Sequence, residues 1–355
     1  MKVNLGDCAQ LIKSRVGTEE ALEDSYVSTD NMLPNRGGIK FGDSNLPKSE
    51  TVNDYQKGDI LVSNIRPYFK KIWFADRDGT RSGDVLCFRA RNVGILDEYL
   101  YCVLQSDSFF NYVVATSKGT KMPRGDKKAI LNYEFDLPSR EEQYKKYNPI
   151  LLIEEKIRLN NQINNNLLNL ANTLFKHYFP DINTGTDKIG DYIKNFDKLR
   201  KPLSKKQRSE IPGKYRYIGA TSVNDHIDKY NFDGIYLLLG EDGTVQDEYG
   251  FPILQYTFGK FWPNNHAHVL QGKNVSTEWL YLYFSQRNIS GIVTGAVQKK
   301  VSQKNMNSLK FKLPDSQELK KFDKIIQPLF SKIRSTKLEN YQLEELKRVL
   351  LTKLF

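Results

Sequence analysis

Residues 116–138 read TSKGTKMPRGDKKAILNYEFDLP, and residues 292–314 read IVTGAVQKKVSQKNMNSLKFKLP. At an offset of 176 residues (295 − 119), Gly119 aligns with Gly295 and Leu137-Pro138 aligns with Leu313-Pro314. Upstream, DEYLYCVLQSDSF (97–109) resembles TEWLYLYFSQRNI (277–289), and YVSTDNM (26–32) resembles YIGATSV (217–223). A repeat of this length predicts the duplication of one large unit, with loop insertions that shift the offset, rather than an array of short repeats.

A helical tail follows each copy of the repeat and carries a heptad pattern. Apolar residues and asparagines alternate in steps of three and four over four heptads, which is typical of helices packed in a coiled coil. We expect the two tails to pair with each other, although two amphipathic helices packed on their own globular domains would fit the same pattern. The predicted seam residues are Ile150, Ile153, Ile157, Asn164, Leu167 and Leu174 in the first tail, and Ile326, Leu329, Ile333, Asn340, Leu343 and Leu350 in the second.

The middle of each seam is polar, and each tail contains a proline. If the asparagines share a layer, they fix the register of the helix pair at some cost in stability. Lys347 interrupts the apolar seam, and Leu346 could substitute for it. Because proline either opens a helix or kinks it, we expect a break or kink near Pro149 and near Pro328, with Asn148 capping a helix that starts at Pro149.

The segments outside the tails mix strand and helix patterns. The predicted fold class is α+β, with two similar mixed domains that are each followed by a long helix. Each globular half is long enough to bury its own core, and residues 97–115 read as a helix. Predicted strands cover 58–63, 71–75, 84–89, 234–239, 256–261 and 267–270. The predicted globular domains are 1–138 and 183–314, and the predicted helical regions are 139–182 and 315–355.

The composition indicates an acidic partner. The 355 residues include 53 lysines and arginines against 42 acidic residues, a net charge of +11 with a pI near 9.2. Nucleic acid is the first choice of partner and an anionic membrane surface the second. No stretch approaches the roughly 20 apolar residues of a membrane helix, and residues 1–15 lack the apolar core of a signal peptide. Three widely spaced cysteines form no disulfide framework or zinc site, so we expect a cytoplasmic protein.

Basic residues gather in several short segments. Residues 194–214 carry a charge of +6 (8 − 2) and two prolines, which predicts a loop that contacts DNA phosphates, although a solvated lysine-rich loop fits equally. Basic clusters in 66–71 and 118–124 have a counterpart in 298–304, and arginine and glutamine can read base edges. For any single residue, plain surface charge is the alternative. The residues predicted to contact DNA are Arg36, Arg66, Lys70, Lys71, Lys118, Lys121, Arg124, Lys198, Arg200, Lys201, Lys205, Lys206, Arg208, Lys260, Gln298, Lys299, Lys300 and Lys304.

The sequence contains no recognisable catalytic motif. It has no GxxxxGK[ST] loop, no GxGxxG after a strand, no NPPY-type methyltransferase segment, and neither HExxH nor GxSxG. His266-Ala267-His268 could supply half of a metal site, but without a cysteine or carboxylate at ligand spacing, hydrogen-bonded structural histidines are favoured. Asp315 and Glu318 superficially match a nuclease PD…ExK motif, but Asp315 or Ser316 suits a helix N-cap. We predict no catalytic residue and no metal site.

Together these features resemble the DNA-specificity subunits of type I restriction–modification systems (HsdS). The resemblance extends over essentially the whole chain and rests on the duplicated domain–helix plan, since none of its motifs is a strong signature alone. The segments that carry it are GDILVSNIRPYFKKIWFADRDG (58–79), IGDYIKNF (189–196), LLLGEDGTVQDEYGFPILQYTFGKFWPNNHAHVL (237–270), KFKLP (310–314) and LEELKRVLLTKLF (343–355).

The resemblance implies a function and a set of partners. In this family two target-recognition domains each read half of a bipartite double-stranded DNA site, and the two helices pair antiparallel as a spacer. Methyltransferase (M) subunits dock on the helices, and restriction and translocase (R) subunits join them. The chain itself would hold no cofactor and perform no catalysis, because S-adenosylmethionine belongs to the methyltransferase and ATP with Mg²⁺ to the motor. The recognition loops vary within the family, so contact residues do not carry over.

Two other functions remain open from the sequence. A DNA-processing nuclease with an unrecognised site would cleave DNA in the presence of a divalent metal ion. A coiled-coil scaffold protein without a DNA role would show no salt-dependent affinity for DNA.

Overall fold

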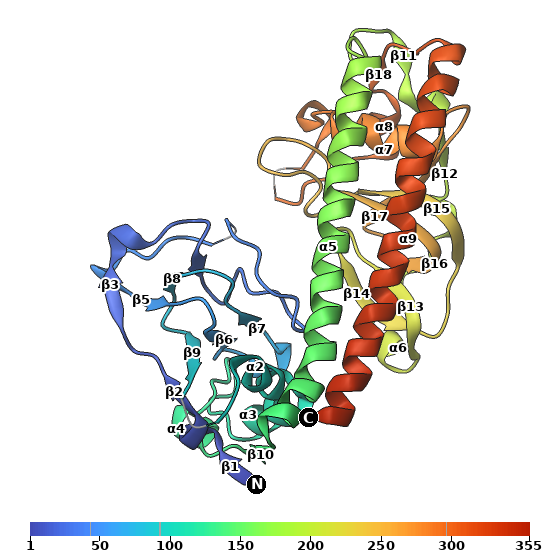
Figure 1. The fold of residues 1–355 in the computed structure, drawn as a ribbon. Coiled ribbons are helices and arrows are strands. Elements are labelled where there is room, and N and C mark those ends of the chain that lie inside the picture. Colours follow the sequence, from blue (N-terminus) through green and yellow to red (C-terminus); the bar gives the residue numbers. More distant parts are fainter. Residues whose placement is uncertain (43, 92–93, 296) are drawn as a thin grey trace. The chain divides into compact units, whose positions relative to one another are not determined.

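The structure is a computed structural model and describes residues 1–42, 44–91, 94–295 and 297–355. The chain divides into two compact units: unit 1 is Met1–Leu159 with Asn340–Phe355, and unit 2 is Asn160–Glu339. Two long helices, α5 (Arg140–Tyr178) and α9 (Ser316–Leu354), contribute to both units (Figure 1). Each unit therefore combines one mixed globular domain with part of both helices.

Unit 1 contains two four-stranded sheets among its described residues, with the strand orders β2-β9-β6-β7 and β3-β5-β8-β4. A separate pair, β1 with β10, joins the start and end of the globular domain. The strands are β1 (Lys2–Asn4), β2 (Ala9–Leu11), β3 (Arg15–Gly17), β4 (Tyr26–Val27), β5 (Thr51–Tyr55), β6 (Ile60–Ser63), β7 (Ile72–Phe74), β8 (Gly79–Arg81), β9 (Val85–Ala90) and β10 (Glu134–Asp136). The short helices are α1 (Leu5–Cys8), α2 (Asp97–Gln105), α3 (Asp107–Ala115) and α4 (Lys127–Leu131), with a 3₁₀ turn η2 at Pro67–Phe69.

Unit 2 contains a six-stranded sheet among its described residues, with the strand order β12-β17-β15-β16-β13-β14. The pair β11 with β18 joins the ends of its globular domain. The strands are β11 (Asp187–Lys188), β12 (Ile193–Asn195), β13 (Pro212–Ile218), β14 (Val223–Ile227), β15 (Phe232–Gly240), β16 (Leu254–Pro263), β17 (Ala267–Gly272) and β18 (Lys310–Phe311). The short helices are α6 (Lys205–Ser209), α7 (Thr277–Ser285) and α8 (Gln303–Asn307).

The duplication predicted from the sequence is confirmed. Helices α4 and α8, and likewise α5 and α9, differ by 176 residues at both of their ends. The strand order β2-β9-β6-β7 in unit 1 recurs as β12-β17-β15-β16 in unit 2. Tyr26 and Tyr217, which the repeat aligns, both lie buried on a strand that pairs parallel with its neighbour. The two domains therefore share one topology as well as a sequence pattern.

Two local expectations were wrong. Residues 97–115 form two helices, because Ser106 has an extended backbone and its hydroxyl caps α3 by accepting a hydrogen bond from the Phe109 N–H. Residues 194–214 are not simply a loop, because they contain α6 and the start of β13. Ser204 and Gln207 form a capping box that starts α6, a signal that the basic composition of the segment obscured.

Neither proline breaks its long helix, so the expected break and the expected N-cap at Asn148 were wrong: α5 and α9 are each 39 residues long with the proline inside. A kink near each proline stays a prediction. Upstream of Pro149, at the start of helix α5, the Ser139 hydroxyl accepts from the Glu142 N–H and the Glu142 carboxylate accepts from the Ser139 N–H. This capping box was visible in the sequence. The predicted N-cap of α9 is confirmed, because the Asp315 carboxylate accepts from the Gln317 N–H at 2.6 Å.

The predicted pairing of the two tails is confirmed, and it is antiparallel. Within unit 1, Lys347 pairs with Glu154 at 3.2 Å. Within unit 2, the Asn160 amide donates to the Glu339 carboxylate at 2.8 Å. Also within unit 2, the Asn164 side chain accepts a hydrogen bond from the Thr336 hydroxyl. From Asn160 to Asn164 the partner thus moves from Glu339 back to Thr336, so the helices run antiparallel. In the core of unit 2, Ile326 and Ile333 of α9 join Ala171 and Phe175 of α5.

The predicted seam positions face the helix pair, but the polar layer and the position of Lys347 differ from the expectation. Ile150, Ile153, Ile326 and Ile333 are buried, as are Asn164 and Asn340, whereas Ile157, Leu167, Leu174, Leu329, Leu343 and Leu350 are partly buried. Asn164 accepts a hydrogen bond from the Thr336 hydroxyl, so its layer pairs an amide with a hydroxyl. Leu346 does not replace Lys347: its side chain is 48% exposed, and Lys347 keeps its seam position through the ion pair with Glu154.

Two global expectations can be checked directly. Among the described residues, no helix combines the length and the apolar character needed to cross a bilayer. Cys8, Cys87 and Cys102 are buried free thiols, in accord with the prediction that they form no disulfide framework.

Candidate nucleic-acid interface

Each unit contains one element made of two loops, which we call the two-loop element. In unit 1 it consists of residues 64–71, which connect β6 to β7, and residues 118–124. The second loop closes on itself, because the Lys118 N–H donates to the Arg124 carbonyl and the Arg124 N–H donates to the Lys118 carbonyl, both at 2.9 Å. The Arg66 N–H then donates to the Pro123 carbonyl at 2.8 Å and joins the two loops.

In unit 2 the two-loop element consists of residues 241–253, which connect β15 to β16, and the described residues of 294–300, which are 294, 295 and 297–300. The Thr294 N–H donates to the Lys300 carbonyl at 2.8 Å, and the Lys300 N–H donates back at 2.7 Å. These residues lie 176 positions after Lys118 and Arg124, so the same hydrogen bonds recur in both copies. The Gly243 N–H donates to the Lys299 carbonyl at 2.9 Å and joins the loops here.

The backbone conformation explains why both copies of the repeat have a glycine at this position. Gly119 has φ +93° and Gly295 has φ +90°, a left-handed conformation that glycine adopts without strain. A Cβ atom built on Gly295 would lie 2.1 Å from the Gln298 carbonyl oxygen. The glycine therefore allows the tight turn that closes the second loop of the element.

The structure brings ten of the predicted DNA-binding residues together on or beside the two-loop elements. In unit 1 most of them are exposed, whereas Lys70 and Lys71 are partly buried. In unit 2 all four are exposed, and Lys304 lies on the adjoining helix α8. These residues are Arg66, Lys70, Lys71, Lys118, Lys121, Arg124, Gln298, Lys299, Lys300 and Lys304.

Three predicted contact residues support the first element by bonds within unit 1. Arg36 and Lys70 both bond to the Asp107 carboxylate, at 2.5 and 2.6 Å, and these cations lower the pKa of Asp107, Lys70 more than Arg36. Lys71 donates to the Thr29 carbonyl at 2.6 Å, and burial lowers the pKa of its ammonium group. The DNA contacts predicted for these residues remain predictions, but their charges already have intramolecular partners.

The backbone beside this element is strained. Arg66 and Lys70, at either end of η2, have left-handed φ angles of 49° and 51°, and Asn35 and Arg36 have φ angles of 54° and 62°. The two pairs meet, because the Asn35 N–H donates to the Phe69 carbonyl and the Arg36 N–H donates to the Lys70 carbonyl. Left-handed non-glycine residues cost energy and gather at functional sites, which is consistent with a binding role here.

The basic segment 194–214 divides into structural arginines and exposed lysines. Arg200 bonds to Glu241 at 2.7 Å, and Arg208 bonds to Asp225 at 3.2 Å, so both arginines hold elements of unit 2 together. The other predicted residues of this segment, Lys198, Lys201, Lys205 and Lys206, are all exposed, so their charges remain available for phosphate contacts. Lys260, on β16, is also exposed, with its ammonium group 4.5 Å from the centre of the Tyr230 ring.

Four exposed lysines of residues 194–214 are predicted to contact DNA phosphates. Replacing Lys198, Lys201, Lys205 and Lys206 with glutamine should weaken DNA binding for every sequence, because phosphate contacts supply affinity without reading bases. The salt slope of log K should flatten by roughly 0.9 for each phosphate that a lysine no longer neutralises, as measured by fluorescence anisotropy at several salt concentrations. Changing Lys320, Lys321, Lys324 and Lys332 of α9 to glutamine alters the net charge equally and serves as the control. An effect confined to one cognate sequence would instead make the four lysines base readers.

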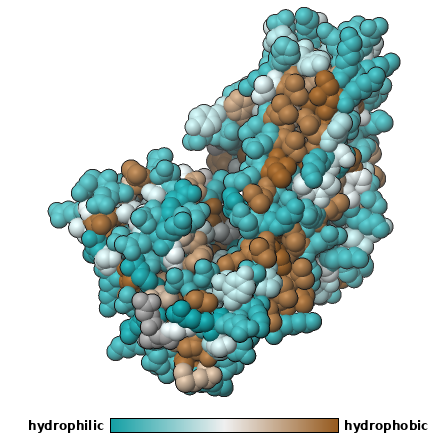
Figure 2. All heavy atoms as spheres, in the orientation of Figure 1, coloured by the Kyte–Doolittle hydropathy of each residue, from teal (hydrophilic) through white to brown (hydrophobic). Residues whose placement is uncertain are grey.

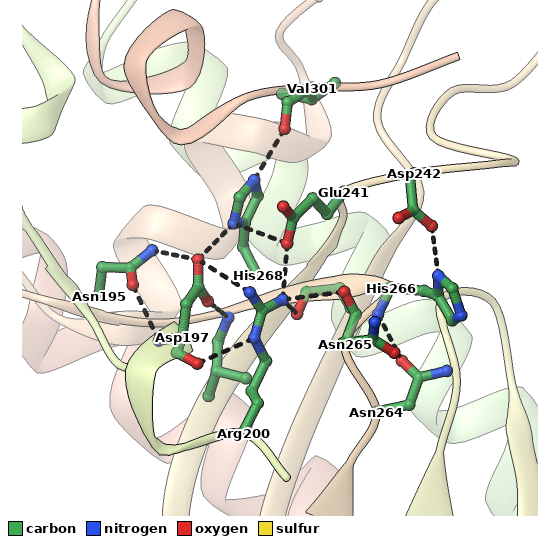
Figure 3. Close-up of polar contacts among 12 residues, drawn as sticks. Asn195, Asp197, Arg200, Glu241, Asp242, Asn264, Asn265, His266, His268 and Val301 are labelled. Atoms are coloured by element: carbon green, nitrogen blue, oxygen red, sulfur yellow. Dashed lines mark hydrogen bonds and ion pairs between the residues drawn. The ribbon is translucent and has the colours of Figure 1, made fainter. Parts of the chain in front are cut away.

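A buried charged network lies beside the second two-loop element (Figure 3). His268, on β17, is 1% exposed, and its Nδ1 lies 2.6 Å from the Asp197 carboxylate while its Nε2 lies 2.8 Å from the Val301 carbonyl. Because neither acceptor carries a hydrogen, both ring nitrogens must donate, and His268 is an imidazolium ion. Asp197 also accepts from the Val269 N–H at 2.8 Å and from Asn195 at 2.9 Å.

The charges of this network stabilise each other. Burial acts to lower the pKa of His268, but the hydrogen bond and charge of Asp197, the Val301 carbonyl and Glu241 outweigh it and raise the pKa above 6.5. Burial acts to raise the pKa of Asp197, but His268, the Val269 N–H and Asn195 outweigh it and hold the pKa below 3.8. Val301 directly follows the loop 294–300, and its N–H donates to the Glu241 carbonyl at 2.8 Å. The network therefore anchors the second two-loop element to the sheet.

Asp197, Glu241 and His268 offer ligand atoms within 4.8 Å of one another, as a metal site would. However, the guanidinium of Arg200 lies 2.7 Å from Glu241 and 3.6 Å from Asp197, and the His268 Nδ1 carries a proton. A metal ion would need that nitrogen deprotonated and would face the arginine charge. These residues fit an ionic network better than a metal centre.

The histidines are hydrogen-bonded structural residues, as the sequence favoured. His266 lies just before β17 and its Nδ1 pairs with Asp242, so it does not share the partners of His268 (Figure 3). The sequence reasoning missed Asp197 and Glu241, because they lie far from His268 along the chain and no local spacing connects them. The charged cluster could be found only from the paired strands that bring it together.

Comparisons with known proteins agree with this architecture. Residues 186–348 match the family model of the type I restriction modification DNA specificity domain. A putative type I restriction enzyme specificity subunit of Haemophilus influenzae is 30% identical over 129 residues, which are 36% of this chain and 32% of that protein. The type I restriction enzyme HindI specificity subunit of the same species is 28% identical over 189 residues, which are 50% of this chain and 40% of that protein. The matched segments thus span less than half of either relative.

The fold has a counterpart among solved structures. The S subunit of a type I restriction–modification system from M. genitalium superposes with a TM-score of 0.58 and 16% identity, covering 100% of this chain and 96% of that chain. At this identity the likeness concerns the fold. The sequence matches therefore place a type I restriction modification DNA specificity domain at residues 186–348, and they make the chain similar to type I specificity subunits.

Proposed function

We propose that the chain is the DNA-specificity (S) subunit of a type I restriction–modification complex, in which each globular domain reads one half of a bipartite site. The observation that carries the proposal is the two-loop element, which recurs in both units with the same backbone bonds and with basic residues on it. A scaffold protein would have no reason to keep two such charged loop pairs. Two domains of similar topology but different loops suit a target with two different halves.

The basic residues of the elements suit the two tasks of a DNA reader. Exposed lysines contact phosphates and supply affinity that falls with salt. Arginine and glutamine side chains at the loop surface can form paired hydrogen bonds with purine edges, which supply specificity. The residues that perform each task are to be sought first among those of the eighteen predicted residues that are exposed, because Arg200 and Arg208 already pair with Glu241 and Asp225.

The paired helices suit a spacer that sets the gap between the two half-sites. Two modules that read one face of B-DNA must lie about one helical turn, roughly 34 Å, apart. Helices of 39 residues are about 58 Å long at 1.5 Å per residue, which is long enough to hold such a separation. The buried polar layers formed by Asn160 with Glu339 and Asn164 with Thr336 fix the register of the pair.

Inserting one heptad into each helix should therefore lengthen the unread gap. The insertions belong after Asn160 in α5 and before Glu339 in α9, so that the seam stays in register. They add about 10 Å of helix, or about three base pairs, and should leave both half-sites unchanged. The recognised sequence is read from the methylation pattern. An unchanged gap would contradict the spacer role, and an insertion in α5 alone should destabilise the helix pair.

The helices also suit the partner subunits that the proposal requires. Apolar side chains remain exposed on them in unit 2, where Figure 2 shows hydrophobic side chains over the long helices. They are Ile163, Leu170, Ile325 and Leu338. Exposed apolar faces of this kind mark surfaces for protein partners, here the M subunits, with R subunits joining the complex. The chain itself performs no catalysis, because the target adenine flips out of the duplex into the methyltransferase pocket. S-adenosylmethionine and ATP with Mg²⁺ would bind the partner subunits.

A methylome tests the proposal. The chain is expressed with the methyltransferase encoded beside it, and 6-methyladenine is mapped by single-molecule sequencing. The expected result is methylation at a split motif with a fixed gap. If the complex assembles but no new methylation appears, the specificity role is wrong. Cleavage of DNA by the chain alone with a divalent metal ion would favour a nuclease instead.

A further inference from the structure

Each two-loop element presents one exposed tyrosine at the tip of its strand-connecting loop. In unit 1 this is Tyr68, in the connection from β6 to β7, and its side chain is 48% exposed. In unit 2 it is Tyr249, in the connection from β15 to β16, and it is 72% exposed. The two loops occupy the same place in the shared strand order, so an exposed aromatic tip is a repeated feature of the fold.

The backbone that carries Tyr68 is held on several sides. The turn η2 is closed by the hydrogen bond from the Phe69 N–H to the Arg66 carbonyl, and the Asn35 N–H binds the Phe69 carbonyl from another segment. Lys70, which follows, is tied to Asp107. The strained ends of this turn persist because the surroundings hold them. The ring of Tyr68 touches the neighbouring Phe69, with ring centres 4.7 Å apart, and both rings face solvent.

The backbone that carries Tyr249 is also held in place, here by hydrogen bonds with the side chains of Asp247 and Asn288. The Asp247 carboxylate accepts from the Tyr249 N–H at 3.0 Å and from the Phe251 N–H at 2.8 Å. The Asn288 amide donates to the Tyr249 carbonyl at 2.7 Å. Both backbone polar groups of this residue are therefore bonded, while its ring remains in solvent. Unrelated local bonds produce the same result in the two units.

We propose that Tyr68 and Tyr249 are DNA-contacting residues, each of which stacks its ring on an unstacked base at the half-site read by its own unit. This inference rests on the proposed function and names the residues that perform part of it. The partner is duplex DNA with a locally unstacked base, because each tip belongs to an element whose other loop carries exposed basic residues, Lys118, Lys121 and Arg124 in unit 1 and Lys299 and Lys300 in unit 2. The Asp247 carboxylate beside Tyr249 is bound by N–H groups of its own loop.

The chemistry of the tips suits this role. A single exposed aromatic residue is ordinary on a protein surface, but here the exposure recurs at the same loop, on a fixed backbone, in an element that carries basic residues on its other loop. A fixed backbone reduces the entropy that the loop loses on binding. A tyrosine ring can stack on any base. In the proposed function the target adenine leaves the stack, and the bases beside it are left with an open face that a ring can cover.

The test uses the chain assembled with its methyltransferase subunits and cognate DNA carrying 2-aminopurine at one position at a time across both half-sites. The fluorescence of 2-aminopurine rises when the base loses its stacking neighbour. The variants are Tyr68→Ala, Tyr68→Phe, Tyr249→Ala and Tyr249→Phe. Each alanine variant is the control for the other half-site, and each phenylalanine variant keeps the ring. Assembly is checked by size-exclusion chromatography.

Tyr68→Ala should brighten the probe at one position in one half-site, Tyr249→Ala should do so in the other half-site, and both phenylalanine variants should match the wild type. The affinity for cognate DNA should fall about tenfold to a hundredfold in each alanine variant, with the salt slope unchanged because every lysine and arginine is kept. If no probe position responds, or if one variant alters both half-sites, the inference is wrong even though the wild type selects a split sequence. If the wild type selects no split sequence, the proposed function fails and this inference fails with it.

Discussion

Replacing residues 1–138 with the matching domain of a specificity subunit that reads another sequence should change one half of the recognised DNA site. The other half and the gap should stay the same, because unit 2 keeps its own two-loop element. Affinity for the original half-site should fall on the order of a thousandfold, since each mismatched base pair costs about 1–3 kcal/mol. The methylation pattern of cells that express the chimera gives the result directly.

The structure indicates where to make the exchange. Strand β1 pairs with β10, from Lys2 with Asp136 to Asn4 with Glu134, so both strands must be exchanged together. The capping box of Ser139 and Glu142 must stay, because it starts α5. Exchanging residues 183–314 is the matched experiment for the other half-site. A chimera that changed both halves at once would contradict the modular interpretation.

Replacing Asp197 with alanine should destabilise unit 2 by about 3–5 kcal/mol, because the buried imidazolium of His268 loses its carboxylate partner. Urea denaturation followed by tryptophan fluorescence measures the loss. A Trp73→Phe background restricts the signal to Trp262 and Trp279, which both lie in unit 2. The matched control is Asp225→Ala, which removes the partly exposed partner of Arg208 and should cost about 1 kcal/mol or less. Equal losses in the two variants would mean that the network does not anchor the fold.

The same network predicts how the stability of unit 2 depends on pH. The folded pKa of His268 is raised, so its contribution is fully present below the ordinary value of 6.5 and is lost as the pH rises through the raised pKa. The folded pKa of Asp197 is lowered, so its contribution is present above 3.8 and is lost as the pH falls through the lowered pKa. The free energy of unfolding should therefore decline as the pH rises from about 6.5 through the raised pKa of His268. In a His268→Gln variant, this decline should be smaller.

Much of the fold could be predicted from the sequence because it depends on local patterns. The repeat placed Gly119 and Gly295 at equivalent positions, and the structure gives both the left-handed backbone that favours glycine. The heptads predicted the helix pair, since burial along a helix follows the polarity of every third or fourth residue. The prolines misled the prediction of helix starts, because Pro149 lies inside α5 while the capping box at Ser139 decides where it begins.

Only part of the candidate DNA interface could be predicted from the sequence. The sequence identified the basic segments that lie on the two-loop elements, but it did not single out the exposed tyrosine tips, because exposure depends on the surrounding loops. It also placed Arg200 and Lys201 in one set of DNA contacts. In the structure, Arg200 forms a partly buried ion pair with Glu241, whereas Lys201 is exposed.

By itself, the sequence determined the duplication, the α+β class and the two long helices with their seam, because periodicity and residue type act locally along the chain. Only the tertiary structure decided which charged side chains form ion pairs within the protein and which face solvent. Asp197, Glu241 and His268 are brought together by β17 and the strands and loops beside it, and an ion pair between such distant residues leaves no trace in local spacing. The pairing of strands that are distant in sequence decides which charges of the site interact, whereas local sequence patterns decide the helices and strands that carry them.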